Sequence, residues 1–224
     1  MNQSAIYSEA DHFIRYDKGI NPDADEKILP VLDDILENKK GKKLIVIKML
    51  GVHVDFVFRY PDENLSTFRR YLYQLKKKTK EAEMYHYNKA ISYSAGIIAK
   101  IMKTAENRSE PAMLLFSSDH GICIFDKGYF QTPATCRNGY HIPAMVLLNP
   151  ALSALTLQKA KDTLKCNENM PLTEDYYFET IAALSGISYP KADKSYDLTE
   201  VCDPLNGQKR QLFDFGRVFR YEDL

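Results

Sequence analysis

The sequence predicts an α/β protein with a wound, mainly parallel sheet and helices on both faces. Short apolar runs rich in Leu, Ile and Val lie at residues 44–47, 113–116 and 144–148. None of them alternates with polar residues, as expected of strands that are covered on both faces of a parallel sheet. Amphipathic segments lie between and around these runs, and an alternation of strands with helices is typical of a wound α/β sheet.

Helical periodicity predicts the helices. Residues 25–38 carry apolar side chains at helical spacing and end at a loop rich in Lys and Gly. Residues 64–83 and 88–103 both fit amphipathic helices, and residues 174–184 form a further helix that ends before a glycine. Residues 211–221 alternate weakly, which predicts an edge strand near the end of the sequence.

The composition indicates a packed domain without a general affinity for polyanions. Hydrophobic residues make up 45% and aromatic residues 12% of the 224 residues, more apolar surface than an unfolded chain carries. The 30 Lys and Arg residues balance the 30 Asp and Glu residues, so no net field draws the protein to nucleic acid or to an anionic membrane. Any contact with a polyanion must be local, and nucleic acid is not an expected partner.

The sequence shows neither a membrane-spanning segment nor an export signal. Its uncharged stretches fall short of the roughly 20 residues that cross a bilayer, and its start has no basic and apolar signal regions. A chain expressed alone is therefore expected in the cytoplasm. The four cysteines lack Cys-x-x-Cys spacing and leave the compartment open, with two disulfide bridges arithmetically available after export.

Asp119-His120-Gly121 is the sharpest local signal, because it directly follows the predicted strand at residues 113–116. At a strand end that opens into a turn permitted by Gly, a carboxylate and an imidazole can converge on one cation. Oxygen and nitrogen ligands together suit Zn²⁺ or Mn²⁺ better than Ca²⁺. The alternative is a turn carboxylate beside a hydrogen-bonded histidine, which is the commoner role of an isolated Asp-His pair.

His53 follows Gly51 after the predicted strand at residues 44–47. Its imidazole could hold a phosphate oxygen or a metal, and a histidine satisfied by backbone groups is an equally good interpretation. His12 and His86 are interpreted as structural or surface residues.

A cluster of lysines, Lys76-Lys77-Lys78 with Lys80, follows the predicted helix pattern. The simplest interpretation is the solvated end of a helix. A patch that binds lipid phosphates is the minority alternative.

Five short motifs follow one another along the chain. They are Gly51-Val52-His53, Arg59-Tyr60-Pro61, Tyr87-Asn88-Lys89, Ser118-Asp119-His120-Gly121 and His141-Ile142-Pro143. This ordered set resembles the carboxyl-terminal part of the catalytic domain of bacterial phosphoethanolamine transferases, the sulfatase-like branch of the alkaline phosphatase superfamily. The resemblance is strongest over residues 12–200, and it implies that residues 1–224 form a single partial sulfatase-like domain whose amino-terminal part is missing.

The resemblance implies a function. Family members move phosphoethanolamine from phosphatidylethanolamine to lipid A or the core of lipopolysaccharide, on the periplasmic side of the inner membrane. By resemblance Asp119 and His120 are ligands of Zn²⁺ (or Mn²⁺), His53 contacts phosphate, and His141 has no assigned role. In such chemistry the metal activates a hydroxyl nucleophile and neutralises phosphoryl charge. Phospholipid and lipopolysaccharide are the implied partners.

The sequence also departs from the family pattern. The nucleophile and the acidic metal ligand, which lie upstream in the family, have no counterpart before His53. Lys48, Lys89 and Ile122 stand where the family has His, Asn and Glu. Because catalytic zinc ordinarily has three protein ligands, the chain is expected to be inactive by itself and to need an amino-terminal partner chain.

These observations leave two main hypotheses. The chain is the carboxyl-terminal part of a phosphoethanolamine transferase, or it is a degenerate, non-catalytic sulfatase-like domain that acts as a binding or regulatory partner. The order of the motifs favours the first, and the residues at positions 48, 89 and 122 favour the second. A free-standing phosphohydrolase ranks last, because no Ser or Thr occupies a recognisable helix start beside a metal site.

Overall fold

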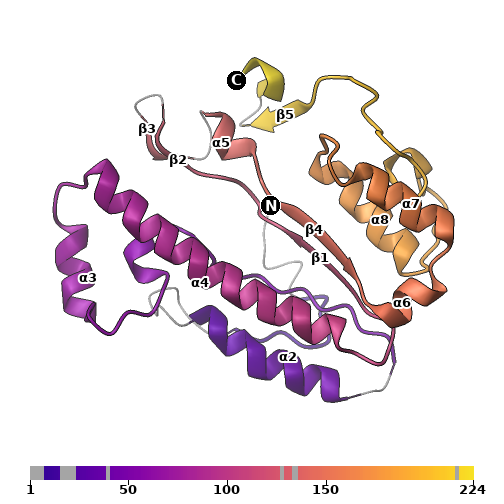
Figure 1. Ribbon diagram of the computed structural model, residues 1–224, viewed down its shortest axis with the longest axis horizontal. Helices are drawn as coiled ribbons and strands as arrows, with labels where there is room; N and C mark the ends of the chain where they lie inside the picture. The colour runs from indigo at the N-terminus through magenta and orange to yellow at the C-terminus, as the bar shows by residue number, and fades with distance from the viewer. Residues whose placement is uncertain (1–7, 16–23, 39–40, 127–128, 133–135, 215–216) are drawn as a thin grey trace. The chain divides into compact units, whose positions relative to one another are not determined.

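The chain divides into two compact units. The computed structural model describes residues 8–15, 24–38, 41–126, 129–132, 136–214 and 217–224. Unit 1 comprises Met1–Ile101 and unit 2 comprises Met102–Leu224. The described part of unit 1 is built from helices and loops, and all the described strands lie in unit 2 (Figure 1).

The helices of unit 1 agree in part with the prediction. The short helix η1 (Ala24–Lys27) continues into α2 (Ile28–Glu37), as the pattern at residues 25–38 predicted. The predicted helix at residues 64–83 is broken, because α3 (Thr67–Gln74) ends at Leu75 and α4 (Lys80–Glu106) begins five residues later. α2 runs beside α4 (Figure 1), where Glu26 Oε2 accepts a hydrogen bond of 3.2 Å from Tyr93 and Oε1 lies 3.1 Å from Lys100 Nζ.

The predicted strand at residues 44–47 is wrong. The segment belongs to no strand, and Leu44 and Val46 are 85% and 82% exposed. An apolar, β-branched run shows a preference for extended backbone and for burial. It does not supply the neighbouring strand that a sheet requires, and none of the described residues pairs with this segment.

Unit 1 packs around aromatic rings with a few enclosed polar groups. Phe56, in the short helix η2 (Phe56–Phe58), meets the Tyr87 ring edge to face at 5.1 Å. The Arg70 guanidinium lies 5.5 Å from the centre of the Tyr60 ring. Tyr60 Oη and Nδ1 of the buried His86 are 2.7 Å apart, so His86 is a structural residue, as the sequence suggested.

In unit 2 the two other predicted strands are confirmed. β1 (Met113–Ser117) pairs with β4 (Ala144–Leu148) in the register Met113↔Leu148 to Ser117↔Ala144. The pair is antiparallel, as are the other pairs among the described residues. The described strands therefore do not form the mainly parallel sheet that the sequence predicted. Apolar runs without alternation report how a strand is covered and do not fix the direction of its neighbour.

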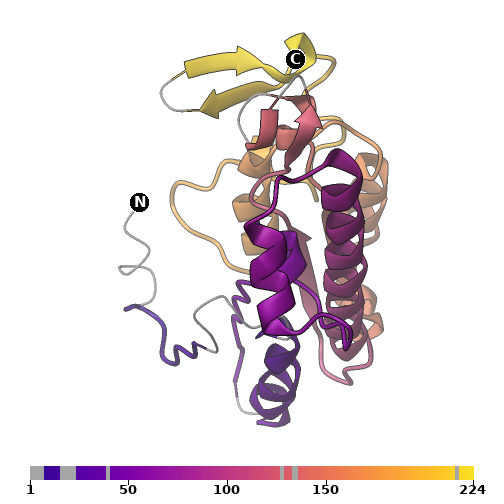
Figure 2. The same ribbon diagram turned by 90° about the vertical axis from the view of Figure 1, so that its left-hand side faces the viewer.

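Two hairpins complete the strands of unit 2. β2 (Cys123–Asp126) pairs with β3 (Tyr129–Thr132), and β5 (Gln211–Asp214) pairs with β6 (Arg217–Arg220), which Figure 2 shows as two yellow arrows. The edge strand predicted at residues 211–221 is thus a hairpin. It is followed by the short helix η5 (Tyr221–Asp223).

Helices lie on both sides of β4 in the sequence of unit 2. The short helix α5 (Arg137–Tyr140) precedes β4, and α6 (Pro150–Leu155) and α7 (Gln158–Asn167) follow it. The predicted helix at residues 174–184 is confirmed as η3 (Glu174–Tyr176) running into α8 (Tyr177–Leu184), and η4 (Lys194–Tyr196) comes after it. Gly186 ends α8 with a φ of +68°, and its amide donates to the Ala183 carbonyl, as in a glycine-terminated helix.

Disulfide bonds link the cysteines in sequence order. Cys123 pairs with Cys136, and Cys166 pairs with Cys202. The first bond ties β2 to the start of α5, and both of its cysteines are fully buried. In the part of the chain that the structure describes, no helix combines the length and the apolar character needed to cross a membrane.

Asn149 fixes the end of β4 to the start of β1. Its side chain is fully buried. Oδ1 accepts hydrogen bonds of 2.9 Å from the amides of Ala112 and Leu152, and Nδ2 donates to the carbonyls of Arg108 and Glu110. One amide group therefore caps α6 and satisfies the backbone that leads into β1.

Asn149→Ala should lower the free energy of unfolding by about 2–4 kcal/mol, because it removes a helix cap and leaves buried backbone groups unpaired. Urea denaturation followed by circular dichroism measures this change. Asn88→Ala at an exposed position of α4 is the control, and it should change the free energy by less than about 0.5 kcal/mol. Similar losses for both variants would show that Asn149 is not the clamp described.

His86 should make the stability of the protein sensitive to acid. Burial lowers the pKa of His86, an effect that the Glu83 charge opposes. The unfolded state, with an ordinary pKa of about 6.5, then takes up the proton first. The contribution of His86 to stability is complete above about pH 6.5 and is lost as the pH falls toward the folded pKa.

His86→Gln should therefore flatten the dependence of the urea midpoint on pH between about pH 7.5 and about pH 5.5. Substitution of the exposed His12 by Gln is the control and should leave the dependence as it is. An unchanged slope in His86→Gln would rule out His86 as the titrating group.

Candidate functional site

The turn that follows β1 carries Asp119 and His120, and its shape requires glycine at position 121. The Gly121 amide donates a 2.8 Å hydrogen bond to the Gly139 carbonyl. A Cβ atom at Gly121 would lie 1.9 Å from the carbonyl oxygen of Asn138, closer than two such atoms can approach. The turn is thus held against α5 by a backbone contact that only glycine permits.

Asp119 and His120 are both exposed in this turn, and the His120 side chain is oriented by the backbone. His120 Nδ1 lies 2.8 Å from the Gly121 carbonyl oxygen. A carbonyl can only accept, so Nδ1 carries a hydrogen, and in the neutral imidazole Nε2 keeps its lone pair. This arrangement, in which one ring nitrogen donates to a carbonyl, is the usual one in metal-binding histidines.

The Asp119 carboxylate shares this corner with a second acidic group. Asp119 Oδ1 accepts a 3.1 Å hydrogen bond from the His120 amide. Ser117 Oγ lies 3.5 Å from Glu174 Oε1 and 3.3 Å from Tyr177 Oη. Burial raises the pKa of Glu174, the Ser117 hydroxyl opposes that rise, and the negative charge of Asp119 adds to it. Glu174 is therefore within electrostatic reach of Asp119.

Glu174 and Tyr177 are not among the site residues predicted from the sequence. Ser117 and Glu174 are 57 positions apart in the chain, and no motif joins them. The one available signal was an acidic residue at the start of a predicted helix. Such residues commonly serve only the helix itself.

The donor set at this corner fits a divalent cation in part. Asp119 offers a carboxylate and His120 offers Nε2, an oxygen and nitrogen pair that suits Zn²⁺ or Mn²⁺. Among the described residues, however, no three His, Cys, Asp or Glu side chains are placed to share one ion. Since catalytic zinc ordinarily has three protein ligands, this pair is at most part of a coordination sphere.

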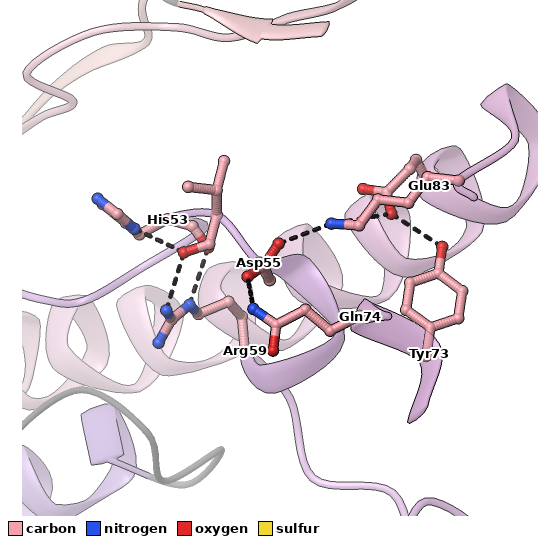
Figure 3. A network of polar contacts seen from close by, with 8 residues as sticks. His53, Asp55, Arg59, Tyr73, Gln74 and Glu83 are labelled. Atoms are coloured by element: carbon pink, nitrogen blue, oxygen red, sulfur yellow. Dashed lines mark hydrogen bonds and ion pairs between the residues drawn. The ribbon is translucent and has the colours of Figure 1, made fainter. Parts of the chain in front are cut away.

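His53 lies in unit 1, on a loop that is held by side chains from both directions. The Asp25 carboxylate accepts hydrogen bonds of 2.8 and 2.7 Å from the amides of Leu50 and Gly51. Arg59 donates from Nε to the His53 carbonyl at 2.8 Å and from a terminal nitrogen to the Val54 carbonyl at 2.9 Å (Figure 3). Gly51 has a φ of +56°, which favours glycine at this turn.

The His53 ring, like the His120 ring, has its Nδ1 next to a backbone carbonyl oxygen. His53 Nδ1 lies 2.7 Å from the Val54 carbonyl oxygen, so Nδ1 donates, and in the neutral ring Nε2 again keeps its lone pair. His86 and His141 differ, because Nδ1 of each lies next to a tyrosine hydroxyl. The two histidines selected from the sequence are thus distinguished by their backbone partners. His53 belongs to unit 1, and Asp119 and His120 belong to unit 2.

An ionic network secures the segment that follows His53 (Figure 3). The Asp55 carboxylate lies 2.6 Å from Lys78 Nζ and also accepts a hydrogen bond from Gln74. Lys78 Nζ lies 3.6 Å from the buried Glu83 carboxylate, which accepts a 2.9 Å hydrogen bond from Tyr73. Burial of Tyr73, helped by its bond to Glu83, raises the pKa of its phenol. The loop of His53 is thereby fastened to α3 and α4.

Comparison with known proteins identifies the family. The sulfatase family model matches residues 3–187, most of this chain. The chain therefore belongs to the sulfatase family.

Curated relatives of the chain include phosphoethanolamine transferases. The chain is 29% identical over 130 residues to phosphoethanolamine transferase EptC of Escherichia coli K12, which covers 54% of this chain and 22% of that protein. It is 26% identical over 132 residues to phosphoethanolamine transferase EptA of Helicobacter pylori, which covers 56% of this chain and 25% of that protein. The matches thus span about a quarter or less of the length of these relatives.

A solved structure confirms the predicted fold class. The soluble domain of lipooligosaccharide phosphoethanolamine transferase A from Neisseria meningitidis matches with a TM-score of 0.65 and 19% identity. The match covers 80% of this chain and 56% of that one. The α/β, sulfatase-like fold expected from the order of motifs is therefore correct, although the parallel pairing within it was not found among the described strands.

Gly121→Ala should destabilise unit 2 by about 2 kcal/mol or more, because its Cβ forces the turn away from the Asn138 carbonyl. The free energy of unfolding in urea measures the loss, and the NMR signals of the His120 ring should shift as its bond to the Gly121 carbonyl is disturbed. Gly96→Ala is the control. Gly96 lies in α4 with no atom within 4 Å of a built Cβ, so this change should stabilise the helix by about 0.5–1 kcal/mol. A neutral Gly121→Ala would refute the required close approach.

Proposed function

We propose that this chain forms part of the catalytic domain of a metal-dependent phosphoethanolamine transferase. The enzyme moves phosphoethanolamine from phosphatidylethanolamine to lipid A or the core of lipopolysaccharide. The observation that carries the proposal is the Asp119 and His120 pair after β1, with Nδ1 of His120 engaged by a carbonyl and Nε2 left as an acceptor. Membership of the sulfatase family and similarity to phosphoethanolamine transferases support it.

The residues of this chain have separate roles in the proposed reaction. Asp119 and His120 would supply an oxygen and a nitrogen ligand to Zn²⁺ or Mn²⁺, which would contribute neutralisation of charge on the phosphoryl group. His53, when protonated, donates from Nε2 to a phosphate oxygen. Asp25 and Arg59 keep the loop of His53 in one conformation through their backbone hydrogen bonds.

The proposed site is completed by groups from elsewhere. Among the described residues, no third His, Cys, Asp or Glu side chain is placed to share an ion with Asp119 and His120. A further segment or an amino-terminal partner chain supplies the missing groups, and this chain by itself is inactive. The family match across residues 3–187, which takes in both units, supports a single partial domain.

The disulfide bonds bear on the compartment. Cys123–Cys136 and Cys166–Cys202 would persist in an oxidising environment and would be reduced in the cytoplasm. We therefore place the working protein in the periplasm, where family members act, in preference to the cytoplasmic location expected of a chain expressed alone.

A non-catalytic sulfatase-like domain is the second candidate. Two observations favour it. The turn after β1 offers only Asp119 and His120 as ligands among the described residues. Lys89 stands where the family has Asn, and its ammonium lies 5.8 Å from the centre of the Tyr85 ring. Such a domain would bind a partner without transferring a phosphoryl group.

Zinc titration tests the assigned ligands. Isothermal calorimetry of the disulfide-bonded chain should show weak zinc binding, because two protein ligands hold the ion less firmly than three. Asp119→Asn and His120→Gln should each weaken the association constant at least about tenfold, since each removes one of the two ligands. His12→Gln, at an exposed histidine outside the site, should bind zinc as the parent does. If His120→Gln binds zinc as tightly as the parent, the assignment fails.

A chimera separates the two candidate functions. Residues of this chain replace the matched segment in the Escherichia coli relative, and mass spectrometry of lipopolysaccharide detects added phosphoethanolamine. A transferase domain should support transfer, and Asp119→Asn or His120→Gln should abolish it while His12→Gln should not. A chimera that folds and is exported but transfers nothing would support the non-catalytic domain.

A further inference from the structure

Helix α3 exposes apolar side chains and buries one of its two arginines, Arg70. The one buried residue of the helix is Arg70, which is 3% exposed. In contrast, Phe68 is 69% exposed and Leu75, at the end of the helix, is 84% exposed. Tyr71 and Leu72 are exposed as well. A surface helix normally buries its apolar stripe, so this pattern is reversed.

The inward orientation of Arg70 is explained by its hydrogen bonds. Arg70 donates from Nε to the Leu65 carbonyl at 3.0 Å and from a terminal nitrogen to the Val57 carbonyl. These bonds satisfy one carbonyl of η2 and one carbonyl of the loop that precedes α3. Tyr71 also contacts this core, because its ring meets the buried Phe58 ring edge to face at 5.2 Å.

The exposed apolar residues form one continuous face. At about 100° per residue, Phe68, Tyr71, Leu72 and Leu75 fall within a sector of about 100°, roughly opposite Arg70. Leu75 keeps helical backbone angles at the C-cap of α3, so it extends the same stripe. We call these four residues the α3 face.

The segment that carries the α3 face is basic. Residues 64–80 contain no Asp or Glu. Arg69 lies in α3 beside the face, and Lys76 and Lys77 directly follow Leu75; all three are exposed. No ion pair is recorded for Lys76 or Lys77 with any other described residue, whereas Lys78 is engaged with Asp55 and Glu83. Because the whole chain carries no net charge, this is a local concentration of positive charge.

We propose that the α3 face with Arg69, Lys76 and Lys77 docks onto the surface of an anionic phospholipid bilayer. Bulky aromatic and aliphatic side chains enter the boundary between headgroups and acyl chains, and the basic residues meet lipid phosphates. A protein partner would have to place acidic groups opposite these three cations. An anionic bilayer presents negatively charged phosphates over its whole surface, so it matches the cations in any orientation. The minority interpretation of the lysine cluster from the sequence thereby gains structural support.

The absence of tryptophan from the sequence permits a site-specific test. Phe68→Trp places a single fluorophore in the α3 face of the otherwise unchanged, disulfide-bonded chain. With vesicles of one part phosphatidylglycerol to two parts phosphatidylcholine, its emission should shift to the blue as the ring leaves water. With vesicles of phosphatidylcholine alone, the affinity derived from the shift should be at least about tenfold lower. Added salt should lower the affinity for the anionic vesicles. Leu155→Trp, at an exposed leucine of unit 2, should show no shift.

Vesicle sedimentation measures the contribution of each part of the face. Phe68→Ser with Leu75→Ser should reduce binding to the anionic vesicles at least about tenfold, because the apolar anchors are lost. Lys76→Glu with Lys77→Glu should reduce it by a similar factor and remove most of the salt dependence. The matched controls are Leu155→Ser with Leu157→Ser and Lys165→Glu with Lys191→Glu, which make the same chemical changes at exposed positions elsewhere and should leave binding intact. Circular dichroism and urea midpoints establish that each variant is folded.

The proposal is overturned if Phe68→Trp shows no blue shift with anionic vesicles, or if Leu155→Trp shows the same shift. It is also overturned if the parent binds no vesicles but forms a dimer in sedimentation velocity that Phe68→Ser with Leu75→Ser dissolves, because the face would then be a protein interface. None of these measurements uses zinc or a transfer reaction. Their outcome is therefore independent of the proposed transferase function.

Discussion

The candidate chemistry of unit 2 depends on one close backbone contact, between the Gly121 amide and the Gly139 carbonyl. This contact bends the chain directly after β1 and leaves no room for a side chain at position 121. The bend places the Gly121 carbonyl where it accepts the hydrogen of His120 Nδ1. The imidazole is thus fixed in one tautomer before any cation arrives. A ligand that is already ordered loses less conformational freedom when it binds, which favours the assigned role over that of a free surface histidine.

The sequence predicted the elements that depend on local chemistry and missed those that depend on partners. β4 begins and ends where its apolar run does, and α8 ends where Gly186 supplies a positive φ. The direction of the β1 and β4 pairing was predicted wrongly, because a run of Leu, Ile and Val reports burial and not orientation. Residues 44–47 carry the same kind of pattern yet form no strand, since a strand also needs a neighbour that local sequence cannot guarantee.

The candidate site shows the same division. Asp119 and His120 were selected because they follow an apolar run and precede a glycine, which are local features. Glu174 contacts Ser117 across a separation of 57 positions, and Asp25 reaches the His53 loop across 25. Sequence spacing also could not tell which nitrogen of each histidine is engaged. That distinction appears only in the structure. A backbone carbonyl lies beside Nδ1 of His53 and of His120, whereas a tyrosine hydroxyl lies beside Nδ1 of His86.

The reversed orientation of α3 follows from hydrogen-bond demand. Periodicity predicted an amphipathic helix in this region, and it would have placed the apolar stripe inward. The carbonyls of Val57 in η2 and of Leu65 instead draw Arg70 inward, and an unmatched buried carbonyl costs more than an exposed leucine. The same helix holds Asp55 through Gln74, two residues after His53. The outward apolar face and the loop of His53 therefore share one support, helix α3.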